Sequence, residues 1–179
     1  CMIGTGYVGL VSGVCFSDLG NNVICVDKDI NKIKNLKNGN IPIYEPGLEE
    51  LVLKNYKNKR LNFSTNLKDS IRKSDIIFIC VGTPTKKNSN RADLSQVYSV
   101  GNEISKSIKD SDIIFICVGT PTKKGGSSAD LSQIYKVSKE ISSSINKFKI
   151  IITKSTVPVT TGDEIEKILS KKNNKKKFS

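Results

Sequence analysis

Short apolar runs alternate with polar and amphipathic stretches along this chain of 179 residues. Residues 23–27 form a β-branched run that stops at an acid, and residues 75–81 form another that stops before a glycine. Between such runs lie stretches that resemble helices, including residues 10–19 and residues 30–36, the second closed by Gly39. Strands that alternate with helices are typical of βαβ units, so the pattern predicts an α/β fold built on a parallel sheet.

The remaining segments continue the alternation. A loop with two prolines, residues 40–47, leads into a predicted helix near residues 48–55, and residues 61–65 favour a third strand. Near the other end, residues 150–152 form an apolar run, and residues 160–163 resemble the cap of a last helix. Only three residues precede the first glycine, whereas strands usually run about five or six, so we expect the first strand to begin upstream of this sequence.

A glycine motif opens the first helix. Gly4, Gly6 and Gly9 form G-x-G-x-x-G after an apolar strand remnant, and Asp27 follows 18 positions after Gly9. In this context Gly4 permits a tight turn, Gly6 leaves room for a pyrophosphate, and Gly9 lets helix and strand pack closely. Asp27 at a strand end is placed to bind the ribose hydroxyls and to repel the extra phosphate of NADP, which predicts NAD. For the glycines the alternative is an ordinary turn, and for Asp27 the alternative is a solvated strand end.

Hydroxyl side chains follow three later strands. Gly82 and Thr83 come after one apolar strand, Thr120 comes after its copy, and Thr156 comes after residues 150–152. The carboxyl edge of an open α/β sheet lines the ligand crevice, so these residues are candidate cofactor contacts. A plain helix-capping role for the hydroxyls is the alternative.

An internal repeat is the most unusual feature. Residues 74–87 recur without change at residues 111–124, and weaker similarity continues beyond them, which defines repeat copies 74–110 and 111–147. Each copy has the pattern of one strand, one loop and one helix. Two copies do not make a solenoid, which needs about three units, so a duplication, or an error in the assembled gene, is favoured over a selected second site.

Composition narrows the classes of function. The formal net charge is +12, but the lysines are scattered among Asn and Ser rather than interleaved with aromatics, so we expect no nucleic-acid partner. Residues 171–179 are expected to be a basic, solvated tail. No apolar stretch is long enough for a membrane span, and a cytoplasmic location is expected. The cysteines show no C-x-x-C pair and are interpreted as reduced core residues: Cys1, Cys15, Cys25, Cys80 and Cys117.

Four sequence blocks together resemble the UDP-glucose/GDP-mannose dehydrogenase family, and most of all its UDP-glucose 6-dehydrogenases. The blocks are residues 3–10, residues 40–51, the two Val-Gly-Thr-Pro segments, and residues 154–159. The resemblance implies a Rossmann-like doubly wound parallel sheet with an extra duplicated βα unit, over an NAD-binding domain of residues 1–170. It also implies contacts to NAD from the glycine block and from further side chains, which are Tyr7, Val8, Asp27, Lys32, Thr83, Thr120 and Thr156.

The family oxidises UDP-glucose to UDP-glucuronate with two NAD, through a thioester on a cysteine. By resemblance that cysteine, the central helix and the sugar-nucleotide domain lie beyond this sequence, so no catalytic residue and no metal ligand is expected in it. The chain alone is expected to be inactive, and a homodimer is expected only of a full-length enzyme. The alternatives are a non-catalytic NAD-binding remnant and a sister dehydrogenase that acts on GDP-mannose or a UDP-N-acetylhexosamine.

The duplication raises a question of strand placement. In the family, one strand ending in Val-Gly-Thr-Pro lies beside the first strand. A right-handed crossover permits the order 3-2-1-4-4′-5, and we expect copy one beside strand one because this avoids looping out an apolar strand. In the family, the strand that ends in Ser-Thr-Val-Pro lies next to the strand that ends in Val-Gly-Thr-Pro. With copy two inserted between them, Thr156 moves outward by one strand spacing, about 4.8 Å, so Thr83 and Thr156 cannot both keep the family's positions.

Overall fold

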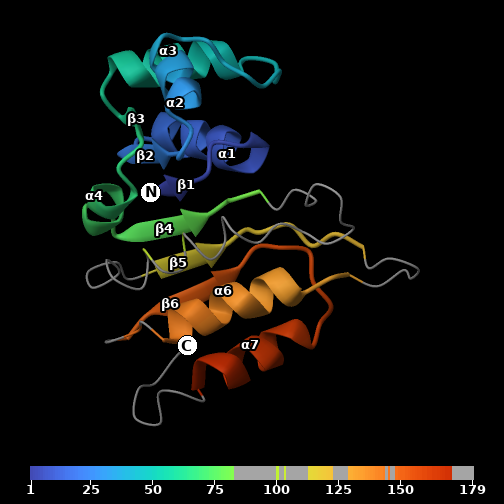
Figure 1. The fold of residues 1–179 in the computed structure, drawn as a ribbon. Helices are drawn as coiled ribbons and strands as arrows, with labels where there is room; N and C mark the ends of the chain where they lie inside the picture. Colours follow the sequence, from blue (N-terminus) through green and yellow to red (C-terminus); the bar gives the residue numbers. More distant parts are fainter. Residues whose placement is uncertain are drawn as a thin grey trace.

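The computed structural model describes residues 1–82, 100, 103, 113–122, 129–143, 145 and 148–170. In it a parallel sheet of six strands is packed against helices (Figure 1). The strand order is β3-β2-β1-β4-β5-β6, which is a doubly wound sheet with one added strand. The predicted fold class and the predicted order 3-2-1-4-4′-5 are therefore confirmed.

The strands have two to four residues, and the helices have six to twelve. The strands are β1 Met2–Ile3, β2 Val23–Val26, β3 Leu61–Ser64, β4 Ile76–Ile79, β5 Ile113–Ile116 and β6 Ile150–Thr153. The helices are α1 Tyr7–Asp18, α2 Ile30–Lys37, α3 Leu48–Lys57, α4 Leu67–Arg72, α6 Ser132–Ser142 and α7 Thr161–Ser170. Sequence analysis did not single out α4, whose six residues are too few to display helical periodicity.

Local signals explain where several helices begin. The Asp29 carboxylate accepts the backbone N–H groups of Asn31 and Lys32 at the start of α2, and the Asn66 side chain accepts that of Asp69 at the start of α4. Such caps satisfy donors that have no partner inside the helix. α3 instead follows Gly47, whose φ of +78° suits glycine.

The repeat enters the sheet in register. Ile76 of β4 pairs with Ile113 of β5, which pairs with Ile150 of β6, so each step along this half of the sheet spans 37 residues. The rings of Phe78 and Phe115 stack, with centroids 4.3 Å apart and planes 7° apart. β4, the strand of copy one, lies beside β1 as expected, and β5, the strand of copy two, lies between β4 and β6.

The core is divided between the two faces of the sheet. Alternate residues of β4 and β5 enter different clusters: Ile77 and Ile114 pack with the interior residues of α6 and α7, while Phe78 packs with those of α1, α2 and α3. This follows from the two-residue period of a strand.

The helices that the structure describes are all too short or too polar to span a membrane.

The interpretation of all five cysteines as core residues is wrong in part. Cys25 and Cys80 are buried, but Cys15 is exposed, and Cys1 and Cys117 are half-buried. Cys15 lies in α1, where apolar residues occur all around the helix, so the sequence pattern does not reveal which side faces the sheet.

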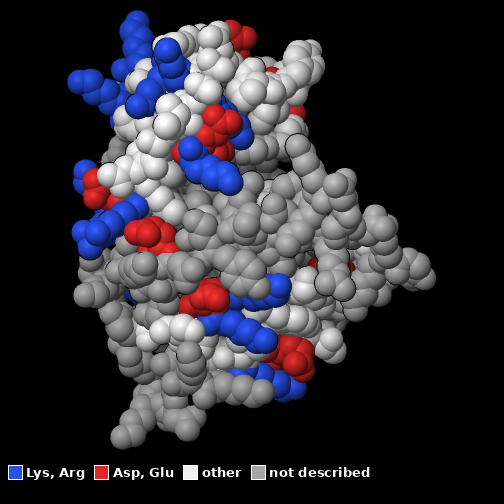
Figure 2. Space-filling view, in the orientation of Figure 1, with Lys and Arg blue, Asp and Glu red and all other residues white. Residues whose placement is uncertain are grey.

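Charged side chains of both signs lie side by side on the surface. In the view of Figure 2, acidic groups lie next to basic ones, and Lys and Arg are densest at the end formed by α2 and α3. Two exposed ion pairs illustrate this arrangement, Lys54 with Asp18 at 2.8 Å and Lys167 with Glu164 at 2.9 Å. Exposed pairs of this kind contribute little to stability.

One buried polar side chain allows a test of the packing. Gln133 of α6 is fully buried, and among the described residues its amide group has no hydrogen-bond partner. An unsatisfied buried amide costs about 1–3 kcal/mol, so Gln133→Met should raise the free energy of unfolding by about 1–2 kcal/mol in urea denaturation. Gln133→Glu, which adds a charge at the same site, should lower it. A Met variant less stable than the parent chain would contradict this account.

Candidate functional site

A cavity of about 620 Å³ opens at the carboxyl ends of the strands. Its walls come from residues that follow four neighbouring strands, among them Gly4, Gly6, Asp27, Thr65, Cys80 and Gly82. The cavity thus lies at the point where the strand order reverses around β1, which is where open α/β sheets bind ligands.

The glycine turn brings α1 close against the sheet. Gly4 has a φ of +100°, and a Cβ there would lie 2.7 Å from the carbonyl oxygen of Cys80. A Cβ on Gly9 would lie 1.9 Å from the carbonyl oxygen of Gly4. Only residues without a side chain permit these approaches, which supports the roles predicted for both glycines.

Gly6 differs from Gly4 and Gly9 because the space that a side chain would occupy there is empty. A Cβ built on Gly6 meets no atom within 4 Å, and the residue lines the cavity. Gly6 is also the N-cap of α1 and offers no side-chain acceptor to the first turn. The backbone donors of a helix start therefore adjoin a cavity with room for a group the size of a phosphate.

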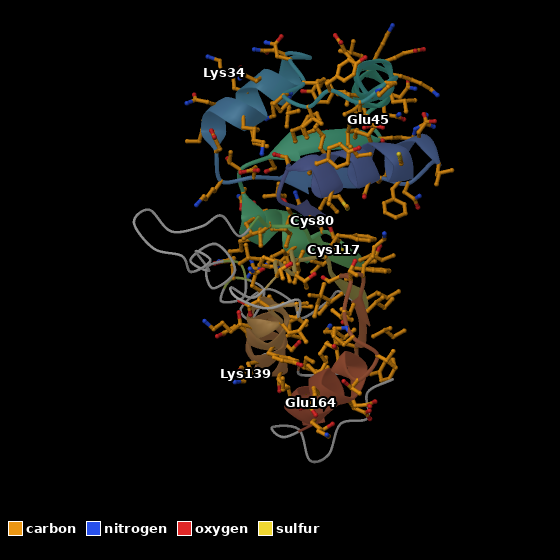
Figure 3. The ribbon with its side chains drawn as sticks, turned by 90° about the vertical axis from the view of Figure 1, so that its right-hand side faces the viewer. Lys34, Glu45, Cys80, Cys117, Lys139 and Glu164 are labelled. Carbon is orange, nitrogen blue, oxygen red and sulfur yellow. The ribbon has the colours of Figure 1, made fainter. Side chains whose placement is uncertain are left out.

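Tyr7 and Val8 are exposed at the start of α1 and are not part of the cavity wall. The Tyr7 hydroxyl donates a hydrogen bond to Oε2 of Glu45, in the loop before α3. This hydrogen bond raises the pKa of the Tyr7 phenol. Glu45, labelled in Figure 3, thereby connects the proline loop to the glycine turn.

Asp27 is the most heavily bonded side chain of the site. Its Oδ2 accepts the backbone N–H of Thr5 at 3.0 Å, the Thr5 hydroxyl at 2.7 Å and the Lys32 ammonium at 3.2 Å. Its Oδ1 accepts the backbone N–H of Asp29 at 3.2 Å. Thr5 is fully buried between two glycines of the motif, so the end of β2 is bonded directly to the glycine turn.

These partners hold Asp27 ionised. Partial burial acts to raise the pKa of the carboxyl group, but the two hydrogen bonds from Thr5, the one from Asp29 and the charge of Lys32 outweigh it and lower the pKa. The Asp27 side chain keeps 16% of its surface exposed and that of Lys32 keeps 28%. A carboxylate and an ammonium group thus stand together at the cavity, where both can meet a ligand.

Five of the residues predicted for the site meet in the cavity wall, and they are Gly4, Gly6, Asp27, Lys32 and Gly82. Thr83 lies outside the described residues. Thr120 and Thr156 are not in the wall; the Thr120 hydroxyl donates to the carbonyl oxygen of Thr156 at 3.0 Å. β6 pairs with β5 rather than β4, and this pairing moves Thr156 one strand outward.

Sequence reasoning missed several residues of the site. Thr5 occupies the variable position of the motif, whose pattern specifies only glycines, so nothing in the motif pointed to its two hydrogen bonds with Asp27. Cys80 and Thr65 follow β4 and β3 directly, and their positions at strand ends were the signal that could have identified them. Among the described residues, no cluster of three or more His, Cys, Asp and Glu could hold a metal ion.

Two substitutions in the glycine motif should distinguish a glycine that packing requires from one that lies beside open space. Gly9→Ala forces a backbone clash, so we expect the free energy of unfolding to fall by about 2–3 kcal/mol or more. Gly6→Ala places a methyl group in the cavity and should change stability by only about 0.5 kcal/mol. Urea denaturation of both variants checks this, and equal losses would contradict the geometry.

The hydrogen bonds of Asp27 predict a dependence of stability on pH. A carboxyl group with a lowered folded-state pKa stabilises the fold above its unfolded pKa of about 3.9 and loses that contribution as the pH falls through the folded value. The stability difference between the parent chain and Asp27→Asn should therefore be full near pH 6 and shrink below about pH 4. Urea denaturation across this range measures it, and a difference that stays constant would refute the assignment.

Comparison with known proteins identifies the sequence family of this site. Residues 1–111 and, again, residues 98–179 match the NAD binding domain of the UDP-glucose/GDP-mannose dehydrogenase family. The UDP-glucose 6-dehydrogenase of Rhizobium meliloti strain 1021 is 43% identical over 96% of this chain and 31% of that protein. A UDP-glucose 6-dehydrogenase of Bacillus subtilis strain 168 is 41% identical over 95% of this chain and 29% of that protein.

Solved structures agree with these matches. A ternary complex of GDP-mannose dehydrogenase from Pseudomonas aeruginosa aligns with a TM-score of 0.60 and 30% identity, over 99% of this chain and 34% of that one. A UDP-glucose dehydrogenase from Pyrobaculum islandicum aligns with a TM-score of 0.59 and 26% identity, over 99% and 33%. The chain spans about a third of the length of the relatives that it matches.

Proposed function

The chain belongs to the UDP-glucose/GDP-mannose dehydrogenase family, and from this we propose that its cavity binds NAD and serves the oxidation of UDP-glucose. The observation that carries the proposal is the position of Asp27, held by Thr5 and Lys32 at the end of β2, in the same cavity as the open side of Gly6. A carboxylate for a ribose and a helix start for a pyrophosphate are the two groups that a dinucleotide site needs.

The described residues fit NAD in two regions. Gly6 and the first turn of α1 would take the pyrophosphate, because a Cβ on Gly6 meets nothing and the N–H groups there have no side-chain cap. Asp27 would accept the hydroxyl groups of the adenosine ribose, with Lys32 beside it. NAD supplies the hydride acceptor when it is bound, and the residues of this chain position it.

The charge of Asp27 favours NAD over NADP. A carboxylate kept ionised at the ribose position repels a 2′-phosphate. Lys32 offsets part of that charge, but its ammonium group is already bonded to Oδ2 of Asp27 at 3.2 Å. In this proposal Gly82, which follows β4, completes the site together with Thr83. Thr120 and Thr156, which follow β5 and β6, are left out because they are not in the cavity wall.

UDP-glucose is proposed as the sugar nucleotide because relatives 43% and 41% identical to this chain carry the name UDP-glucose 6-dehydrogenase. GDP-mannose is the competing substrate, since a GDP-mannose dehydrogenase shares 30% identity and the fold. Formation of NADH by the complete enzyme with each nucleotide sugar, followed by absorbance, would distinguish the two substrates, because the chain alone is expected to be inactive. A cytoplasmic location and a homodimer of the complete enzyme are proposed on the resemblance alone.

Calorimetric titration tests cofactor binding directly. We expect the chain to bind NAD and to bind NADP at least about tenfold more weakly. Asp27→Ala should weaken NAD binding by about tenfold or more, because it removes the ribose acceptor and leaves Lys32 unpaired. Gly6→Ala should weaken binding while leaving the fold intact, because its methyl group would occupy the pyrophosphate position.

A matched control lies on α7, outside the cavity wall. Glu164→Gln removes an exposed ion pair on α7 and should leave NAD binding unchanged. Binding of NADP as tight as that of NAD would refute the role of Asp27. Absence of binding to either dinucleotide, in a chain that is folded by circular dichroism, would refute the proposed cofactor site and also the alternative of a non-catalytic NAD-binding remnant.

A further inference from the structure

The repeat places the same cysteine twice at the same level of the sheet. Cys80 and Cys117 each come one residue after paired strands, since Ile79 at the end of β4 is aligned with Ile116 at the end of β5. The backbone N–H of Cys117 donates to the carbonyl oxygen of Ile79 at 3.0 Å, so the alignment continues through the cysteines. Figure 3 labels the two cysteines on these adjoining strands.

Both thiols project from the same face of the sheet. Two residues earlier on each strand, Phe78 and Phe115 stack ring on ring, and side chains two positions apart share a face. Neighbouring strands lie about 4.8 Å apart. This spacing falls within the range of about 4.4–6.8 Å between the Cα atoms of disulfide-bonded cysteines.

The surroundings make the two thiols unequal. Cys80 is buried, and a Cβ on Gly9 of α1 would lie only 3.2 Å from the Cβ of Cys80, whereas Cys117 is half-buried and reachable from solvent. Lys154 follows β6 at the same level, with its backbone N–H bonded to the carbonyl oxygen of Ile116 at 2.9 Å. The chain thus aligns a buried thiol, a half-buried thiol and an exposed cation.

These neighbours decide which thiol ionises. A hydrogen bond from the Cys80 thiol lowers the pKa of Cys117, and the charge of Lys154 lowers it further, against the effect of burial. The same hydrogen bond, together with burial, raises the pKa of Cys80. The thiolate therefore forms at Cys117, the less buried of the two residues, and a thiolate is the form that attacks disulfides.

We propose that Cys80 and Cys117 are a dithiol modification site, which a small-molecule disulfide oxidises to an intramolecular disulfide. The Cys117 thiolate attacks one sulfur of that disulfide, forms a mixed disulfide and releases one thiolate. Cys80 then gives up its proton and attacks the Cys117 sulfur, releasing the second thiolate. The small disulfide gains two electrons and becomes two thiols, and the chain loses two thiol hydrogens.

Cys25 and Cys15 lack this arrangement. Cys25 is fully buried on β2, where desolvation raises the pKa of its thiol to about 12. Cys15 is exposed on α1 but has no cysteine aligned with it. The site exists only because copy two repeats Cys80 at Cys117 and its strand pairs with β4 in register.

Peptide mapping after exposure to glutathione disulfide tests the proposal. Tryptic peptides 74–86 and 110–123 contain Cys80 and Cys117 and differ only by Asp110 at the start of the second, so mass spectrometry distinguishes them. After alkylation of the remaining thiols, we expect these two peptides to be linked to each other, with a loss of two of the five thiols. An unlinked pair, in a chain whose Cys15 carries glutathione, would overturn the proposal.

Variants identify the order of the steps. In Cys80→Ser, glutathione should remain attached to Cys117, because the second thiol is missing; in Cys117→Ser, no link should form. Cys15→Ser is the matched control and should leave the linked pair unchanged. An unmodified Cys117 in the folded Cys80→Ser variant would overturn the proposed order, and oxidation in urea that gives the same single link would show that the fold does not select it.

Discussion

Helix α1 can lie against the ends of β1 and β4 because three residues at the contact have no side chain. A Cβ on Gly4 would strike the Cys80 carbonyl, one on Gly9 the Gly4 carbonyl, and one on Gly13 the Cys25 sulfur at 2.7 Å. The start of the helix is thereby held at the carboxyl edge of the sheet. The cavity lies next to that position, with Gly4 and Gly6 in its wall.

The bonds of Thr5 extend this constraint to β2. Because Thr5 donates twice to Asp27 from inside the glycine turn, the turn and the strand end cannot move independently. Asp27 and the start of α1, which both adjoin the cavity, therefore belong to one connected unit. The added strand β5 lies beyond β4, outside this unit, and β6 lies one strand further from β1.

Much of the fold could be read from the sequence, because hydrophobic periodicity and the glycine motif both report on local geometry. The order of the strands was expected from the resemblance to the family, and the handedness of crossovers permitted the added strand. Contacts between distant segments could not be read in this way. Thr5 sits at a position that the motif leaves free, and Cys117 came next to Cys80 through a register that only the assembled sheet defines.

The identity of residues 74–87 and 111–124 has a consequence for folding. Two segments with the same side chains compete for one edge of β1, and their local pairing energies with β1 are equal. The choice between them rests on what the chain would leave unpaired: if β5 occupied that edge, β4 would have to leave the sheet with its backbone groups unsatisfied. The sheet as a whole, rather than either segment, therefore determines which pairing forms. At this edge two local pairings have the same energy, whereas elsewhere the local preferences agree with the fold.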